Sequence, residues 1–147
     1  MHSEDKFSGG DWEWLAVDAE GHVGVFTVAG GVPMPEAFRD LDLLERVSGF
    51  ISSLPVRSEA ELIVELPRPD DYVAFAERGL YAYDWTDFHR VRPNHIRQYE
   101  MQARPRTPRR LVDLALPSDI QAAIWIANDL VFGSSMRVTV PRVGFQW

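Results

Sequence analysis

The stretch from Trp12 to Val28 is the sequence feature that most restricts the fold. Its two apolar runs, WEWLAVD (12–18) and HVGVFTV (22–28), are separated by only three residues, the last of which is Gly21. Glycine at the end of so short a connection supplies the positive φ angle that a tight hairpin needs. We therefore predict two antiparallel strands, and a sheet on which the rest of the chain packs.

Two helices are predicted beyond this hairpin. Between Glu36 and Ser53 the apolar residues recur every three or four positions, which is the spacing of one helical stripe. Pro35 suits the first position of that helix. A second, shorter helix is predicted to begin at Pro69 and to end at Gly79, because carboxylates in its first turn favour the helix dipole and glycine commonly follows a last turn.

Further strands are predicted at 62–66, 80–86 and 95–103. Residues 104–110 hold two prolines and are expected to be irregular. The stretch 136–147 is expected to be a strand interrupted by Pro141, which suits a sheet edge.

A third helix is predicted from Ser118, with Gln121 completing a capping box and residues 111–117 forming a strand or an extended approach. IQAAIWIANDLVF (120–132) is apolar nearly all round, so this helix is expected to be buried on several sides. Because strands and helices do not alternate regularly, we predict an α+β domain over 11–147, after a flexible leader at 1–10. Its mixed or mostly antiparallel sheet is expected to have five to seven strands, with about three helices packed on it.

Composition excludes several classes of site. The 147 residues suit one domain, and the absence of cysteine removes disulfides, thiolate nucleophiles and Cys-ligated metals. The four histidines are scattered, and arginines surround two of them, so we expect no metal and no cofactor. No stretch is long and apolar enough to span a membrane, and the start lacks the pattern of a secretory signal, so we expect a cytoplasmic protein.

Charge is divided unevenly along the chain. Residues 1–87 carry a net charge of −12 and residues 88–147 one of +5. Two interpretations follow: the two parts neutralise each other within one domain, or an acidic face is held out for a basic partner.

The segment GLYAYDWTD (79–87) concentrates rings and carboxylates. In a strand, Tyr81, Tyr83 and Trp85 point one way and Asp84 the other. If the rings are buried, Asp84 is the functional candidate; if Asp84 is buried, the rings are the expected interface.

Two alternatives to protein binding are weighed. A small hydrolase or transferase would use Asp84 with an arginine from 90–110, although no nucleophile elbow, metalloprotease or phosphate-loop motif is present. A nucleic-acid-binding protein would use 88–110, which carries seven arginines, two histidines and a single acid. The acidity of the whole chain argues against this second alternative.

The order of several motifs resembles that of small bacterial proteins of the polymorphic-toxin immunity type. The resemblance rests on WLAVDAEGHVGVFT (14–27), FAERGLYAYDW (75–85) and the Y-x-x-x-A-R-P strand exit at 99–105. It implies a non-enzymatic protein that neutralises a basic toxin domain through an acidic and aromatic surface. The residues expected to contact the partner are Asp40, Asp42, Glu45, Asp70, Asp71, Tyr81, Tyr83, Asp84, Trp85 and Asp87.

Overall fold

The predicted hairpin forms the centre of the fold. The computed structural model describes residues 7, 10–64, 69–85 and 98–146. In it β1 (Asp11–Asp18) pairs antiparallel with β2 (Val23–Ala29), and Gly21 has a φ of 85°, as the short connection predicts.

Strands from distant parts of the chain extend this hairpin into a mixed sheet of seven strands, in the order β4-β6-β5-β2-β1-β7, with β8 also pairing with β6. Antiparallel pairing joins β6 to β4, β5 and β8, whereas β5 is parallel to β2 and β7 is parallel to β1. A small second sheet holds β3 and β9. The remaining bounds are β3 (Met34–Pro35), β4 (Ala60–Leu62), β5 (Tyr81–Trp85), β6 (Tyr99–Pro105), β7 (Trp125–Ala127), β8 (Arg137–Val138) and β9 (Phe145–Gln146).

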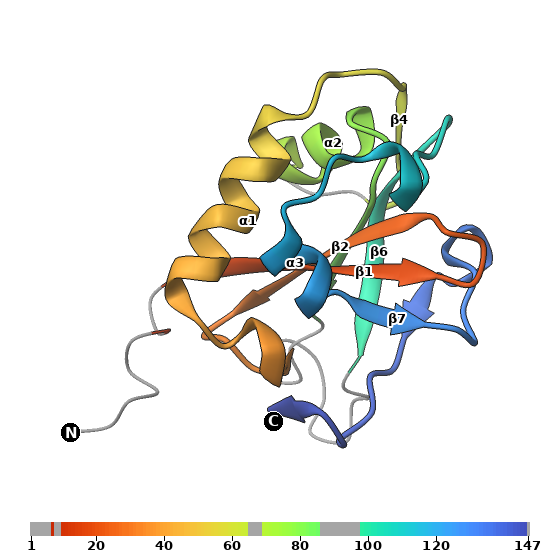
Figure 1. Ribbon diagram of the computed structural model, residues 1–147. Coiled ribbons are helices and arrows are strands. Elements are labelled where there is room, and N and C mark those ends of the chain that lie inside the picture. The colour runs from red at the N-terminus through yellow and green to blue at the C-terminus, as the bar shows by residue number, and fades with distance from the viewer. Residues whose placement is uncertain (1–6, 8–9, 65–68, 86–97, 147) are drawn as a thin grey trace.

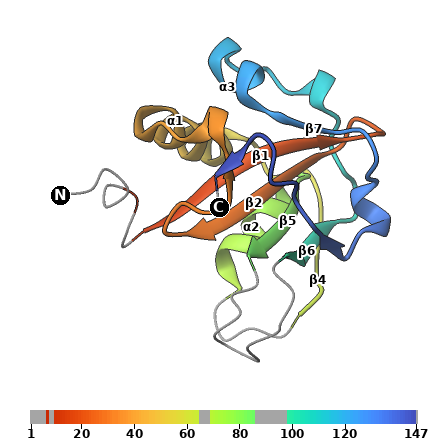
Figure 2. The ribbon, with the colours of Figure 1, turned by 90° about the horizontal axis from the view of Figure 1, so that it is seen from below.

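Three helices accompany the sheet: α1 (Leu41–Ser53), α2 (Asp70–Glu77) and α3 (Ser118–Ala123). In Figure 1 α1 and α2 lie above β1 and β2, while β9 lies below these two strands. Figure 2 shows α1, α3 and β7 on one side of β1, with α2 on the other side. Three short 3-10 segments complete the fold, at Glu36–Phe38, Leu111–Asp113 and Phe132–Ser134. The predicted α+β class is therefore confirmed.

The two faces of the sheet have different cores. On one face Trp14, Phe26 and Tyr83 stack across three neighbouring strands, with ring centroids 4.6 and 4.7 Å apart. On the opposite face Ala82 and Ala103 are buried against α2, whose Ala76 completes a cluster of small side chains. Small residues on both sides allow the helix to lie close to the strands.

The first helix begins later than predicted. Residues Glu36–Phe38 form a 3-10 turn, and α1 starts only after Asp40, whose carboxylate accepts a hydrogen bond from the Leu43 amide at 3.2 Å. Pro35 belongs instead to β3. An aspartate N-cap satisfies a free amide of the first turn, so it fixes the helix start more strongly than the proline does.

The predicted third helix is wrong over most of its length. Helix α3 ends at Ala123, and Ile124 turns the chain into β7, which adds to the free edge of β1. Short apolar runs suit a buried helix and a strand equally, and the β-branched and aromatic residues here favour the strand. The capping box is also absent, because Ser118 makes no side-chain cap bond.

Other boundaries move by a few residues. Strand β4 covers Ala60–Leu62 where 62–66 was predicted, and β6 extends through Pro105 into the segment expected to be irregular. Residues 111–113 form a 3-10 turn rather than a strand. Residues 65–66 and 95–97 lie outside the described part of the chain.

The predicted flexible leader contains a packed residue. Phe7 is buried, its ring lies under the guanidinium of Arg39, and its carbonyl accepts a hydrogen bond from the Trp12 indole at 3.1 Å. Gly31 makes room for this ring, because a Cβ there would come within 2.8 Å of Phe7. An aromatic side chain with such a niche is ordered by burial.

Candidate functional site

A small acidic pocket lies between α2 and the hairpin. Its volume is about 170 Å³. The residues that line it are Asp11 and Glu13 from β1, Thr27 from β2, and Asp71, Tyr72 and Phe75 from α2. Three of these six side chains are carboxylates, and none of the six is basic.

The register of the sheet brings these residues together. Glu13 lies opposite Thr27, and Thr27 lies opposite Asp84, so the three occupy one face of three adjacent strands. Because Gly79 turns the chain from α2 straight into β5, the first turn of α2 lies near the end of β5. That end is also where β2 ends and β1 begins, which places Asp71 over Glu13.

Glu13 is the most perturbed carboxyl group of this pocket. Burial, together with the smaller effects of the charges of Asp71 and Asp11, raises its pKa from 4.5 to about 7. Within the described ranges, no ion pair involves any of these three side chains. The pocket therefore concentrates negative charge that no described cation neutralises.

Thr27 contributes a polar atom without a hydrogen-bond partner. The residue is 7% exposed, and its Oγ1 makes no hydrogen bond to any described residue. A buried hydroxyl left unpaired costs about 1–3 kcal/mol of stability. The side chain lines the pocket, so a donor entering the pocket would meet this oxygen as well as the carboxylates.

Asp84 lies beside Tyr72 of α2, and Arg90, Arg92 and Arg97, which the hydrolase or transferase alternative would pair with it, lie outside the described residues. It accepts a hydrogen bond from the phenol of Tyr72, whose pKa is raised by burial and by the Asp84 charge. Arg104 lies in a different hollow with Glu61 and Tyr81, and it pairs with Glu61 at 3.0 Å. Asp84 therefore supports the wall of the acidic pocket through Tyr72.

The carboxylates predicted as partner contacts occupy two helix starts. Asp70 and Asp71 lie in the first turn of α2, as predicted, and Asp71 enters the pocket. Asp40 caps α1, while Asp42 and Glu45 are exposed on that helix. None of the described contacts joins these three α1 residues to the pocket. Asp87 lies outside the described residues.

Two of the three rings of the predicted interface, Tyr81 and Tyr83, are buried, and Trp85 is half-buried. The rings of Tyr81, Tyr83 and Trp85 share one face as expected, but Tyr83 is fully enclosed and Tyr81 is 6% exposed. Both pack on Phe132, and the Tyr83 hydroxyl donates to the Ser135 carbonyl at 2.6 Å. These two tyrosines build the core, so they are not available as anchors for a partner.

Two arginines of the basic segment pair with the acidic first part of the chain. Arg104 and Arg106 contact Glu61 and Glu59, 3.0 and 3.5 Å away respectively. This agrees with the interpretation that the oppositely charged parts neutralise each other, at the β4–β6 edge. Residues 88–97, which hold Arg90, Arg92, Arg97 and both histidines of the segment, lie outside the described residues.

Sequence patterns alone leave out five members of the pocket: Asp11, Glu13, Thr27, Tyr72 and Phe75. One signal for Glu13 was present, because it alternates with Trp12 and Trp14 and so shares a strand face with Leu15 and Val17. A carboxylate in an apolar row of a central strand is unusual and marks a position that needs a partner or a function.

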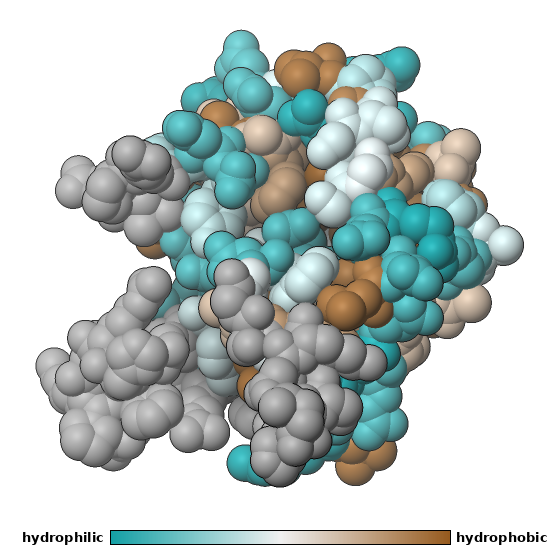
Figure 3. Space-filling view, turned by 90° about the vertical axis from the view of Figure 1, so that its left-hand side faces the viewer, coloured by the Kyte–Doolittle hydropathy of each residue, from teal (hydrophilic) through white to brown (hydrophobic). Residues whose placement is uncertain are grey.

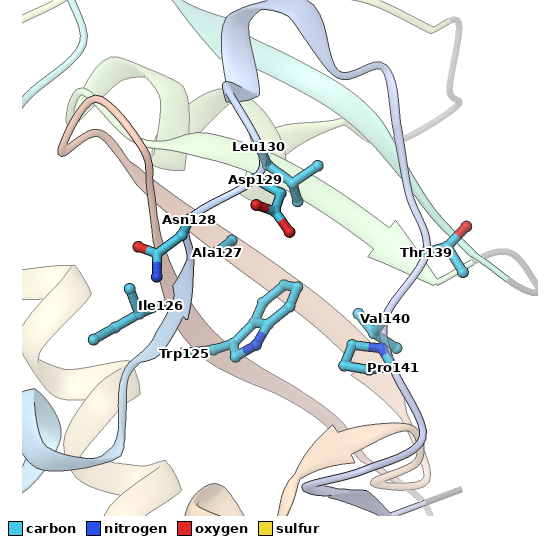
Figure 4. Close-up of a pocket in the computed structure, with 9 residues that line it drawn as sticks. All are labelled: Trp125, Ile126, Ala127, Asn128, Asp129, Leu130, Thr139, Val140 and Pro141. Atoms are coloured by element: carbon cyan, nitrogen blue, oxygen red, sulfur yellow. The ribbon is translucent and has the colours of Figure 1, made fainter.

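A larger hollow of about 450 Å³ lies between β7 and residues 139–141. Figure 4 shows the Trp125 ring between β7 and Val140, with Asp129 at one end of the hollow. Asp129 is the only ionisable side chain among its lining residues, so the described geometry offers no acid–base pair there. This hollow suits apolar contact better than catalysis.

Figure 3 shows the side of the molecule that carries α1, where hydrophilic residues cover much of the described surface and apolar patches are small. Among the described residues no group of three or more metal-ligating side chains is placed to hold an ion. No described helix is long and apolar enough to cross a membrane. Comparisons with protein-family models, curated protein sequences and solved structures gave no match to this chain.

Proposed function

We propose that this protein is a non-enzymatic binding protein that docks a basic protein partner, in the manner of an immunity protein that neutralises a toxin domain. The observation that carries the proposal is the acidic pocket with its rim, where Asp11, Glu13, Asp70 and Asp71 come from β1 and α2 without a described cation beside them. Carboxylates gathered in this way attract and orient a basic surface.

The rest of the described charge distribution supports the same proposal. Arg46, Arg104, Arg106 and Arg137 are each paired with a carboxylate elsewhere on the surface. Those four pairs use Asp119, Glu61, Glu59 and Glu100, so among the described residues the carboxylates at the α2 end of the sheet are left without an ion pair. These carboxylates lie on the start of α2 and on β1, and not on a long loop. The two elements hold them at fixed spacings that a rigid partner can match.

The test uses the product of the neighbouring gene, provided that it carries a basic toxin-like domain. The two proteins are co-expressed and co-purified, and their affinity is measured by calorimetry at several salt concentrations. We expect a complex at micromolar concentration or tighter, with association that slows as salt rises. Co-expression should also rescue growth of cells that carry the toxin domain.

Charge-reversal variants assign the surface. Asp71→Arg should weaken the complex at least tenfold, because it places a cation beside the partner's cations. Asp113→Arg makes the same charge change at the exposed last residue of the 3-10 turn Leu111–Asp113 and should leave the affinity unchanged. Absence of any complex at micromolar concentration, or equal loss in both variants, would overturn the proposal.

A further inference from the structure

We infer that the pocket between α2 and the hairpin is a subsite for one guanidinium group, presented by an arginine side chain of the protein partner. The identity of the donor as a protein rests on the proposed function; the chemistry of the subsite does not. Two independent observations carry the inference: three carboxylates around one small pocket that no described cation neutralises, and the hydroxyl of the buried Thr27 in its wall, which has no partner among the described residues.

The atoms of the pocket match a planar cation with several donors. A guanidinium carries five N–H groups and no acceptor, so it needs oxygens around its edge. The carboxylates of Asp11, Glu13 and Asp71 supply charged acceptors, and the Thr27 oxygen supplies a neutral one. Tyr72 and Phe75 add aromatic surface, on which a guanidinium stacks more favourably than an ammonium does.

Size and charge exclude other ligand classes. A pocket of about 170 Å³ is well below the 300–1,000 Å³ typical of sites for whole small molecules, and suits the end of one side chain. Anions are repelled by the carboxylates. A metal ion is disfavoured because the described residues offer no group of three ligands in position.

Binding of the cation is coupled to the proton on Glu13. The groups that face Glu13 are Asp11 on its own strand, Thr27 on β2, and Asp71 and Tyr72 on α2, with Asp84 behind Tyr72. None of these described groups is cationic, so a bound guanidinium adds positive charge beside this carboxyl group and stabilises its ionised form. Affinity should therefore rise as the pH increases through about 7, where Glu13 loses its proton.

The experiment is a titration of the isolated protein, followed by amide NMR, with N-acetyl-arginine methylamide as the probe. The citrulline analogue is the neutral control, because it replaces one guanidinium nitrogen by oxygen and carries no charge. The lysine analogue distinguishes guanidinium from ammonium. We expect the arginine probe to shift the amide signals of Glu13, Thr27 and Asp71 saturably, the lysine probe to bind more weakly, and the citrulline probe to leave the signals in place.

Variants test each part of the pocket. Glu13→Gln should weaken binding of the arginine probe about tenfold and remove its pH dependence near 7, and Thr27→Val should weaken it several-fold. Asp42→Asn removes one charge from α1 and serves as the matched control, with unchanged affinity. The amide spectrum of each variant reports whether the fold is retained, and Thr27→Ala, which also removes the hydroxyl, replaces Thr27→Val if it is not.

The outcomes separate the subsite from the proposed function. Saturable binding of the arginine probe without any complex with the toxin domain would support the subsite and remove the function. A toxin complex of equal affinity with Glu13→Gln would support the function and overturn the subsite. Equal binding of arginine and citrulline probes, or no shift in the pocket at millimolar concentration, would overturn the subsite outright.

Discussion

The phenol of Tyr72 donates a hydrogen bond to the carboxylate of Asp84, and this contact ties the first turns of α2 to the last part of β5. Tyr72 also lines the acidic pocket, so the same side chain holds the helix in place and closes the pocket on one side. The orientation of Asp71, one residue earlier, depends on this anchoring of the helix.

Tyr72→Phe should lower the free energy of unfolding by about 1–2 kcal/mol, because a hydrogen bond to a charged group is lost at a partly buried site. Urea denaturation at pH 7 measures the change. Asp84→Asn and the double variant complete a mutant cycle. The sum of the two single losses in the free energy of unfolding should exceed the loss in the double variant. Strictly additive effects would show that the two side chains do not interact.

The ionisation of Glu13 should make the protein less stable as the pH rises. Its pKa is about 7 in the folded state and about 4.5 when unperturbed, so between these values the folded state binds more protons than the unfolded state. Stability from this group is fully present below pH 4.5 and is lost as the pH rises through about 7. The loss amounts to roughly 2–3 kcal/mol.

Glu13→Gln should abolish this part of the pH dependence. Its free energy of unfolding should match that of the native protein near pH 4 and exceed it by roughly 2–3 kcal/mol at pH 8. Denaturation at several pH values provides the measurement, and Glu45→Gln on the exposed face of α1 controls for the loss of one charge. A constant difference between Glu13→Gln and the native protein at every pH would contradict the burial of an ionisable group here.

Tyr99→Phe should destabilise the core more than its single missing atom suggests. The Tyr99 hydroxyl accepts a hydrogen bond from the Trp14 indole at 3.0 Å and donates one to the Pro33 carbonyl at 2.8 Å. Its removal leaves two buried polar groups unpaired, at a cost of about 3 kcal/mol. Thermal unfolding followed by circular dichroism would detect this.

Tyr83→Phe provides a graded comparison for that result. The Tyr83 hydroxyl donates mainly to the Ser135 carbonyl, which is partly buried, so its loss should cost about 1 kcal/mol. The test is which substitution lowers the free energy of unfolding more. If Tyr83→Phe does, the buried hydrogen bonds that link Trp14 to Pro33 through the Tyr99 hydroxyl do not stabilise the core as the geometry indicates.

Gly79→Ala should destabilise the protein for two separable reasons. Gly79 has a φ of 89°, which strains any residue with a side chain, and a Cβ there would collide with the side chain of Arg109. We expect a loss of about 2 kcal/mol in the free energy of unfolding. In an Arg109→Ala background the collision is removed and only the backbone part, about 1 kcal/mol, should remain.

The hairpin, the first two helices and the α+β class are predictable because local signals decide them. Gly21 ends a three-residue connection, the apolar stripe of α1 repeats regularly, and Gly79 ends α2. The strand β7 is not predictable in this way. Its partner β1 lies more than a hundred residues earlier, and only that pairing decides whether the run around Trp125 becomes helix or strand.

The candidate pocket was predictable only in part. The alternation of side chains along a strand correctly places Asp84 on the opposite face from the rings of Tyr81 and Tyr83. It also places Glu13 on the same face as apolar residues of its strand. The parallel pairing of β2 with β5 decides two further features of the pocket. Because of it, both faces of β5 are covered, and α2 crosses the sheet face that carries Glu13 and Thr27. Nothing local in the sequence specifies that pairing.

The position of β7 beside β1 affects what a partly synthesised chain exposes. Trp14 contacts the rings of Trp125 and Phe145, so the aromatic face of the hairpin is covered by residues synthesised more than a hundred positions after Trp14. A nascent or truncated chain that stops before Trp125 exposes these rings together with the unpaired edge of β1, a combination that promotes aggregation. The edge of β1 therefore stays unpaired until β7, more than a hundred residues later in the chain, has been made.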